Sequence, residues 1–370
     1  MASTLLASGK TRLPGSTCQR RQLLRWLTLP PALGLLPITA TSLLAPLPVH
    51  ATSAPFQARR LLMGTWVDIT VANSAQPGLA DAVALAFKHM GSLATMMSRF
   101  DPHGALAALN AAAGRAAVAV PPELMRVLHL ARQLSAQTGG AFDITVGALT
   151  GGGNALGAGD IPDDNTVKRA LTHIKPQRLD LNINQHTAYI NDPLTQLDLG
   201  GIAKLPILEA GLGIFKNLGI DGVMINGGGD VLASARQDGQ LWRIGVRDPA
   251  QPEKLLAVLP LQAGVVASSG DYERFVMHEG LRYHHIIDPH TGRPTRGVHG
   301  VTLVANTVAQ VNGLGAAAMV AGPRHGPALL TRLGVLQALL VGTDGQVWLS
   351  PSLAGRLQAP PGQPRVRGLA

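Results

Sequence analysis

Residues 222–235, GVMINGGGDVLASA, consist of two apolar runs with strand character on either side of three consecutive glycines. Short strand-like runs bounded by glycine-rich turns are typical of strands that follow one another directly. Further runs with strand character occur at 242–248, 254–270, 282–288 and 300–306. Because strands succeed one another here with few intervening helices, the pattern predicts an α+β fold with a mixed, largely antiparallel sheet and packed helices, rather than a doubly wound parallel sheet.

Helical patterns flank these strands. In residues 78–100 the apolar side chains recur at three- and four-residue steps, which predicts a helix with one buried face. Residues 308–322, VAQVNGLGAAAMVAG, contain no charged residue and predict a second buried helix, in which Gln310 and Asn312 are the two amide side chains and Asn312 lies among small apolar residues. Its glycines weigh against it, since each costs a helix interior about 1 kcal/mol relative to alanine. No repeat or long linker divides residues 55–355, so we expect one domain there.

The two ends of the chain differ in composition from this middle part. The formal net charge is +9, and five basic residues but no acidic residue fall within residues 1–51. Arg20-Arg21, followed by an apolar stretch and small residues, predicts a twin-arginine-type signal peptide over 1–54 and therefore a periplasmic protein. Prolines interrupt the apolar stretch and argue against a spanning anchor, while peripheral membrane association stays open. The basic, proline-rich residues 356–370 predict a disordered tail.

Composition also excludes some classes of function. Without its first 51 residues the chain is nearly neutral, and it has no basic stripe with interleaved aromatic residues, which argues against nucleic-acid binding. The only cysteine, Cys18, precedes the apolar stretch, so the exported chain would have none. Disulfide bonds and thiolate catalysis are therefore excluded for the exported form.

Four short segments combine polar residues with glycines between apolar runs: GGAFDITVGAL (139–149), LDLGGIAK (197–204), INGGGDV (225–231) and YHHIIDPHTGRP (283–294). Taken singly, each has a structural explanation as a capped turn, a strand-to-helix junction, a glycine-rich turn or an Asp-Pro turn. In the second segment, the glycine pair would let a ligand approach the backbone, and a helix start suits a phosphate group. The spacing of the glycines does not match a dinucleotide-binding GxGxxG motif.

Taken together and in this order, the segments resemble those of the ApbE family of flavin transferases. The resemblance extends from about Met63 to Gly322 and includes MGTWVDITV (63–71), MSRFDPHGALAALN (97–110), SSGDYERF (268–275) and VTLVANTVAQVNGLGAA (301–317). It implies a T-fold-type α+β domain that binds FAD and, with Mg²⁺, moves FMN onto a threonine or serine hydroxyl of an exported or membrane target protein, with release of AMP. The implied partners are acceptor flavoproteins and membrane subunits of respiratory complexes.

The resemblance also assigns residues by their position in the matching motifs. The implied catalytic residues are Asp198, Lys204 and His285. The implied FAD contacts are Met63, Phe100, Ala141, Phe142, Asp143, Asp198, Lys204, His284, His285 and Ile286. The implied metal ligands are the backbone carbonyl of Gly201 and the side chains at Asn312 and Ala316.

The chain departs from the family pattern at several of these positions. Phe100 stands where the family has a tyrosine, and Leu205-Pro206 replaces the Gly-Tyr pair that follows the lysine. Asn312 and Ala316 stand where the family has an aspartate and a threonine, and their spacing of four would place both on one helix face. Because Mg²⁺ prefers charged, hard oxygen ligands, we expect weak metal binding.

Three functions therefore stay open from the sequence. The first is an FMN transferase, possessing all the main motifs but weakened at the metal site. The second is a non-catalytic periplasmic protein that binds or donates FAD during maturation of a respiratory enzyme. The third is a pyrophosphatase that splits FAD into FMN and AMP with water.

Overall fold

The computed structural model describes residues 54–150, 161–278 and 280–361, and the predicted signal peptide lies outside these residues except for its last position. The described residues belong to one compact unit. Among the described residues, no helix combines the length and the apolar character needed to cross a membrane.

Helices and strands occur in runs along the chain, as is typical of α+β proteins. The helices are α1 (Leu79–Met96), α2 (Ala105–Ala111), α3 (Pro122–Gln137), α4 (Gly147–Thr150), α5 (Asp164–Leu171), α6 (Lys204–Asn217), α7 (Leu314–Arg332) and α8 (Pro351–Ala354), with 3₁₀ turns η2 (Pro176–Arg178) and η3 (Val308–Gln310). The strands are β1 (Phe56–Leu62), β2 (Thr65–Val71), β3 (Val118–Ala119), β4 (Leu179–Asn182), β5 (Thr187–Ile190), β6 (Val223–Gly227), β7 (Asp230–Ala233), β8 (Trp242–Arg247), β9 (Leu255–Leu261), β10 (Gly264–Gly270), β11 (Phe275–His278), β12 (Leu281–His284), β13 (Val298–Ala305), β14 (Gln337–Gly342) and β15 (Val347–Leu349).

The main sheet has eight strands in the order β1-β2-β6-β7-β10-β13-β14-β15. All its neighbouring pairs are antiparallel, so the predicted α+β fold with a largely antiparallel sheet is confirmed. Residues 222–235 contain the hairpin β6–β7, in which Gly227 lies opposite Asp230 and the remaining two glycines form the tip. The hairpin lies in the middle of the strand order, so its tip projects from the ends of two central strands.

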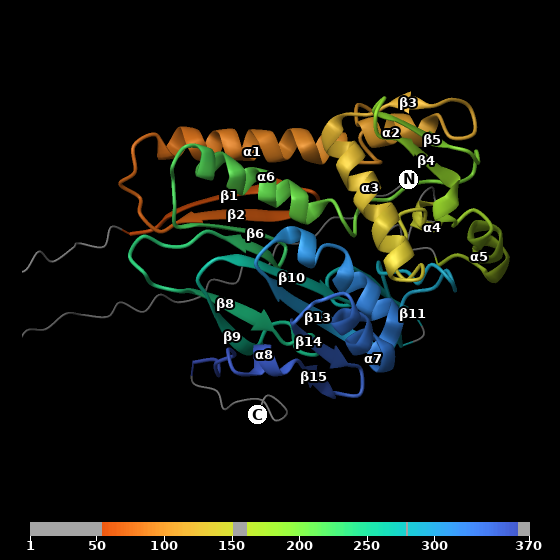
Figure 1. The fold of residues 1–370 in the computed structure, drawn as a ribbon. Helices are drawn as coiled ribbons and strands as arrows, with labels where there is room; N and C mark the ends of the chain where they lie inside the picture. The colour runs from red at the N-terminus through yellow and green to blue at the C-terminus, as the bar shows by residue number, and fades with distance from the viewer. Residues whose placement is uncertain (1–53, 151–160, 279, 362–370) are drawn as a thin grey trace, which may run out of the picture. The chain divides into compact units, whose positions relative to one another are not determined.

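Different layers cover the two faces of this sheet (Figure 1). Helices α1, α6 and α7 pack on one face and share a buried apolar cluster with β2, β6 and β13. Figure 1 shows α1 and α6 lying side by side, and Gly211 permits this approach because a Cβ there would lie 2.6 Å from Sδ of Met90. The ribbon β8–β9 and helix α8 cover the other face with a second cluster around Trp242 and Leu259.

A smaller group of elements, α2, α3 and the sheet β3-β5-β4, extends the first layer (Figure 1). Leu124 and Leu128 of α3 belong to the same buried cluster as Val67 of β2, so the core is continuous between the two groups. The buried side chain of Asn110 adds a polar tie, because its Nδ2 donates to the carbonyl of Leu197 and its Oδ1 accepts from the N–H of that residue.

The predicted helix over 308–322 is wrong in its extent. Residues 308–310 form the 3₁₀ turn η3, and Gly313 then adopts φ +76° before α7 begins at Leu314. A second interruption follows at Gly322, with φ +77°, directly before Pro323. Positive φ is readily available only to glycine. Gly313 thereby separates η3 from α7, and Gly322 interrupts α7 itself. Asn312 therefore precedes α7, and it does not share a helix face with Ala316.

Two smaller differences concern segments of irregular backbone. The sequence of residues 142–149, FDITVGAL, favours a strand or a strand-to-loop junction, but these residues form turns, one isolated bridge at Val146 and the start of helix α4. At the other end, order extends beyond Gly355: Leu357 is buried, and Gln358 pairs with Val258 of β9. Residues 357 and 358 of the predicted tail thus contact the domain through an apolar side chain and a strand edge; residues 362–370 lie outside the described residues.

Candidate active site

Two of the glycine-containing segments, residues 139–149 and residues 197–204, lie side by side. The N–H of Asp198 donates to the carbonyl of Ile144 at 2.7 Å, and Val146 forms a parallel bridge with Gln196. Gly147 makes this approach possible, since a Cβ there would lie 2.3 Å from the carbonyl oxygen of Gln196. The segments 139–149 and 197–204 therefore form one structural unit.

The ring of Phe142 holds this unit against the start of α7. Phe142 is only 6% exposed. Added Cβ atoms at Gly201 and Gly313 would lie 3.1 Å and 3.2 Å from its Cε2, so the ring packs against both glycines. Asn312 completes the contact, because its Nδ2 donates to the carbonyl of Ile202 at 2.9 Å. The residues that precede α6 and α7 thus meet around one aromatic ring.

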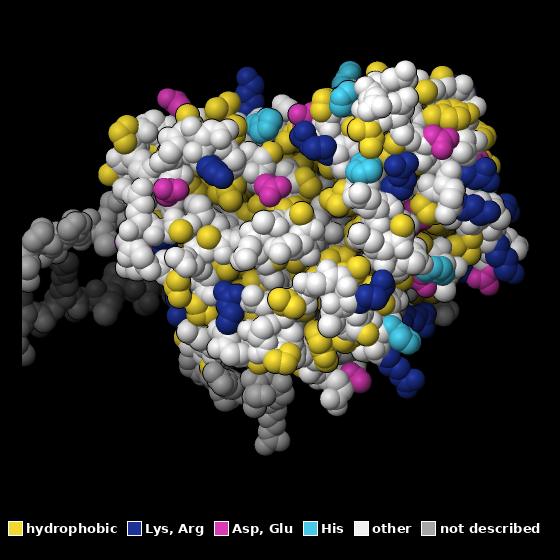
Figure 2. All heavy atoms as spheres, in the orientation of Figure 1, with side chains coloured by type: hydrophobic (Ala, Val, Ile, Leu, Met, Phe, Trp, Pro, Cys, Tyr) yellow, Lys and Arg dark blue, Asp and Glu magenta, His cyan; other side chains and the backbone are white. Residues whose placement is uncertain are grey.

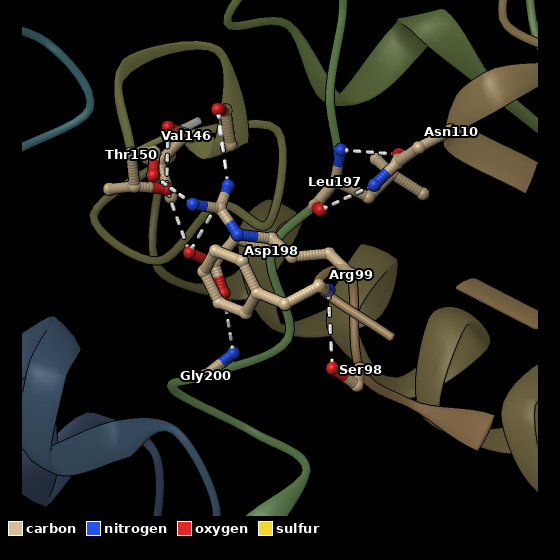
Figure 3. Close-up of polar contacts among 10 residues, drawn as sticks. Ser98, Arg99, Asn110, Val146, Thr150, Leu197, Asp198 and Gly200 are labelled. Carbon is tan, nitrogen blue, oxygen red and sulfur yellow. Dashed lines mark hydrogen bonds and ion pairs between the residues drawn. The ribbon is translucent and has the colours of Figure 1, made fainter. Parts of the chain in front are cut away.

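Asp198 lies on the other side of the same unit, where both its oxygens are engaged (Figure 3). Oδ1 accepts from the N–H of Gly200 at 2.8 Å, and Oδ2 accepts from Oγ1 of Thr150 at 2.7 Å. The guanidinium of Arg99 lies 3.6 Å from Oδ2. These contacts fix the turn that leads into Gly201 and α6, so the observed contacts of Asp198 are those of an orienting group.

Arg99 was not among the sequence predictions. Its guanidinium donates to the backbone carbonyls of Gly147 and Thr150 (Figure 3), and it lies 4.5 Å from the centre of the Phe100 ring. Burial lowers the pKa of Arg99, while the nearby carboxylate of Asp198 opposes this shift. No sequence signal marks a single arginine as part of a site. The ring of Phe100, predicted to contact FAD, is 79% exposed.

Lys204, the first residue of α6, forms an ion pair with Asp230, which lies next to the tip of the β6–β7 hairpin. Its Nζ lies 2.9 Å from Oδ2 of Asp230, whose side chain is 9% exposed, and Oδ1 of Asp230 accepts from the N–H of Ser268. The lysine side chain keeps 28% of its surface exposed. Asp230 was missed as a site residue, although it belongs to the quoted INGGGDV segment, because nothing in that segment indicates its partner.

The two histidines of the fourth segment differ in environment. His284 is buried, and its Nε2 lies 2.9 Å from the carbonyl oxygen of Thr295, an acceptor that requires the hydrogen on Nε2. Burial lowers the pKa of His284. His285 is exposed, yet surrounding atoms desolvate its ring and lower its pKa to about 4, with the charges of Arg274 and Lys204 acting in the same direction. Its Nδ1 donates to the carbonyl of Arg274 at 3.3 Å, which leaves Nε2 as an acceptor.

His290, in the turn after these residues, connects this segment to residues 139–149. Its Nδ1 lies 3.1 Å from Oδ1 of Asp288, and its Nε2 lies 3.3 Å from the carbonyl oxygen of Gly139. The neighbouring Asp143 is buried and accepts from both the N–H and the hydroxyl of Thr145. Burial raises the pKa of Asp143, and these hydrogen bonds partly offset that rise.

Met63 lies in the turn between β1 and β2 and has the unusual φ of +54°. Its carbonyl accepts from Nη2 of Arg274, the residue whose own carbonyl is bound by His285. The same turn meets the tip of the β6–β7 hairpin, since a Cβ at Gly228 would lie 2.7 Å from Oγ1 of Thr65. The backbone at Met63 is thus linked through Arg274 to the late histidine segment.

The structure therefore brings most of the predicted residues into one connected arrangement. Ala141, Phe142, Asp143, Asp198, Gly201 and Asn312 belong to the junction around the Phe142 ring, and Met63, Lys204, His284, His285 and Ile286 belong to the strand and hairpin ends beside it. Ala316 lies in the first turn of α7. A separate hollow of about 170 Å³, lined in part by Asn226, Arg243 and Ser268, contains none of the predicted site residues.

The residues at the predicted metal position do not suit Mg²⁺. Asn312 uses its amide N–H to bind the carbonyl of Ile202, and Ala316 has no donor atom. Within residues 54–150, 161–278 and 280–361, no group of three His, Cys, Asp or Glu side chains is placed to hold a metal ion. Mg²⁺ needs near-octahedral oxygen coordination, usually including carboxylates, and this position offers only one neutral side-chain oxygen.

Figure 2 shows cationic and anionic side chains interspersed over one face, without a continuous basic surface. This distribution agrees with the nearly neutral composition of the middle of the chain.

The burial of His284 leads to a prediction about acid stability. Its folded-state pKa lies below the ordinary histidine value of about 6.5, so the unfolded state binds more protons as the pH falls below that value. The free energy of unfolding should therefore decrease from pH 6.5 towards the lower folded-state pKa. We expect His284→Gln to reduce this decrease, which urea denaturation at pH 7.5 and at pH 5 measures. The exposed His103 provides the control His103→Gln, which should leave the decrease unchanged; an equal effect of both variants would contradict the prediction.

Comparison with known proteins supplies independent information on this arrangement. Residues 63–340 match the model of the ApbE family. An FAD:protein FMN transferase of Rhodobacter capsulatus is 30% identical over 304 residues, covering 80% of this chain and 57% of that protein. An FAD:protein FMN transferase of Treponema pallidum (strain Nichols) is 32% identical over 271 residues, covering 69% and 75% of the two chains. The crystal structure of the ApbE protein from Thermotoga maritima superimposes with a TM-score of 0.74 at 27% identity, covering 82% of this chain and 99% of that one.

Proposed function

The chain belongs to the ApbE family, and from this membership we propose that it moves FMN from FAD onto a serine or threonine hydroxyl of another protein. Relatives named FAD:protein FMN transferase support the choice of donor and of a protein acceptor. In the proposed reaction the hydroxyl oxygen forms a bond to the phosphorus of the FMN half. The bond from that phosphorus to the AMP oxygen breaks, the hydroxyl loses its proton, and AMP leaves. Catalysis of such a transfer depends mainly on positioning and on neutralising phosphate charge.

The observation that carries this proposal is the state of His285. Its ring is exposed, and the lowered pKa keeps it neutral at physiological pH. Because Nδ1 donates to the carbonyl of Arg274, the lone pair of Nε2 is available to accept the hydroxyl proton. The charge of Lys204 acts on the same ring, so a cation lies near the base. Lys204 can then bind the pyrophosphate as a point charge.

The other predicted residues have positioning roles in this proposal. Asp198 orients the turn at Gly200 and Gly201 through its two engaged oxygens. His284, fixed to the carbonyl of Thr295, sets the strand end from which His285 projects. Ala141, Phe142 and Met63 supply backbone and apolar surface for FAD.

One observation favours the second candidate, a non-catalytic FAD-binding accessory protein. Asn312 and Ala316 supply no carboxylate or hydroxyl ligand, so metal-assisted charge neutralisation would be weak at that position. Such a protein would bind FAD and hand it to a respiratory enzyme during maturation. For either function we propose a periplasmic location, reached by the twin-arginine route, with exported flavoproteins or respiratory membrane subunits as partners; this rests on residues 1–54.

The test uses the purified exported form of the chain with FAD and an exported acceptor protein. In-gel fluorescence detects covalently bound flavin on the acceptor, and chromatography detects AMP. Fluorescent acceptor together with stoichiometric AMP is the expected result. His285→Ala should lower both products together, whereas His103→Ala, at an exposed position outside the arrangement, should change neither.

Other outcomes of the same experiment distinguish FAD hydrolysis and the accessory role from FMN transfer. AMP and FMN without labelled acceptor would indicate hydrolysis of FAD by water. Tight FAD binding without either product would overturn the transfer proposal and support the accessory role. An absence of FAD binding would overturn both.

A further inference from the structure

The side chain of Asn312 joins two segments that are far apart in the sequence. Asn312 is 4% exposed, and its Nδ2 donates to the carbonyl of Ile202 at 2.9 Å, across 110 residues of chain. Ile202 directly precedes Ala203, the N-cap of α6, and Asn312 directly precedes Gly313, the N-cap of α7. This bond therefore fixes the starts of two helices that both belong to the candidate site.

The chemistry of this bond distinguishes an amide from a carboxylate. An asparagine N–H₂ can donate to a carbonyl oxygen, whereas an ionised aspartate has only acceptors. An ionised aspartate at 312 would direct a negative charge at the Ile202 carbonyl in a buried position, and a cation or a proton would have to lie between the two oxygens. The residue present makes the contact directly and needs no cation.

The surroundings of Asn312 agree with this interpretation. The other predicted metal position, Ala316, has no side-chain oxygen, and the described residues contain no group of three His, Cys, Asp or Glu side chains placed to hold a metal ion. The Phe142 ring occupies the space beside Gly201 and Gly313. A hard cation that requires six oxygens would obtain few of them from this chain.

We propose that the Asn312–Ile202 hydrogen bond closes the junction of α6 and α7 in place of a divalent cation, and that the chain binds FAD without one. The second part rests on the proposed function, because it assumes that FAD is the ligand. The first part concerns the chain alone and is measurable without FAD.

The first experiment compares the purified exported chain in EDTA and in excess MgCl₂. Its thermal midpoint and its dissociation constant for FAD, measured by flavin fluorescence, should be the same in both conditions. Mn²⁺, followed by its electron paramagnetic resonance signal, should not bind at stoichiometric concentrations. Tight Mn²⁺ binding, or a loss of FAD affinity of about tenfold or more in EDTA, would overturn the proposal.

The second experiment uses Asn312→Asp. This variant should melt about 2–5 °C lower than the original chain in EDTA, because the carbonyl of Ile202 loses its donor. MgCl₂ should restore the midpoint, and the added change Ala316→Thr should increase that response. Asn110→Asp is the matched control, since Asn110 is also buried and also donates to a backbone carbonyl, that of Leu197. It should be destabilised without rescue by MgCl₂.

The outcomes separate this inference from the proposed function. If MgCl₂ does not raise the thermal midpoint of Asn312→Asp, or raises it no more than that of Asn110→Asp, the proposal that the hydrogen bond replaces a cation is overturned. If FAD fails to bind in every condition while the melting results hold, the proposed function fails and the account of the junction stands.

Discussion

Replacing Lys204 by methionine is expected to lower the rate of FMN transfer by about 10²- to 10³-fold. Removal of one group that stabilises developing charge has an effect of this size in enzymes. The effect should lie at the upper end here, because the residues at 312 and 316 supply little metal-based charge neutralisation. The measurement is the initial rate of acceptor flavinylation, with AMP release as the second readout.

The same substitution should destabilise the fold, since it leaves the buried carboxylate of Asp230 without its partner. Breaking a fully buried ion pair costs about 3–5 kcal/mol. The lysine is partly exposed, which reduces the expected loss to about 2 kcal/mol. Asp230→Asn separates the two effects: it should cost stability while keeping the positive charge, and so retain more transfer than Lys204→Met. Lys216→Met, at the exposed far end of α6, is the control for removal of a lysine. Equal rates for Lys204→Met and Lys216→Met would refute a role in transfer.

Replacing Phe142 by alanine is expected to lower the free energy of unfolding by about 3–5 kcal/mol, as measured by urea denaturation. The ring is 6% exposed and packs against Gly201 and Gly313, which have no side chains to fill the space it would leave. Because the residues that precede α6 and α7 pack on this ring, its loss should displace both helix starts. We therefore also expect FAD affinity to fall by more than tenfold.

Phe87→Ala provides a control for the general cost of a cavity. Phe87 lies in α1 and is equally buried, at 3% exposure, but it belongs to none of the site segments. The two variants should lose similar stability, whereas only Phe142→Ala should lose FAD affinity at a temperature where both remain folded. If both lose affinity alike, Phe142 acts through global stability and not through the site.

The fold was predictable where a local pattern directly reflects burial. Val67, Ile69 and Val71 alternate with less buried neighbours in β2, and the three- and four-residue steps of α1 match its buried face. The prediction failed in residues 308–322, where an uncharged run suggested one continuous helix. The interruption depends on the positive φ of Gly313, and its surroundings come from Leu134 and Phe142, which are remote in sequence.

For the site, the motifs predicted which residues gather, but not how they contact one another. The sequence resemblance assigned Lys204 and Asp198, and the structure places them in a connected arrangement whose roles stay predictions. It did not indicate Asp230 or Arg99, because pairing with Lys204 or Asp198 depends on how separate elements pack. The amide of Asn312 was recognised as a departure, while its hydrogen bond to Ile202 became visible only once both helix starts were placed.

The hydrogen bond between Asn312 and Ile202 has a consequence for how this chain can evolve. Asparagine and aspartate codons differ by a single nucleotide, and so do alanine and threonine codons. Positions 312 and 316 therefore lie two point mutations away from an aspartate–threonine pair, with the intermediate Asn312→Asp expected to be unstable when magnesium is scarce. Populations grown with abundant magnesium could cross that intermediate, whereas starvation for magnesium would select the amide, so the supply of an ion in the environment would determine which codon persists.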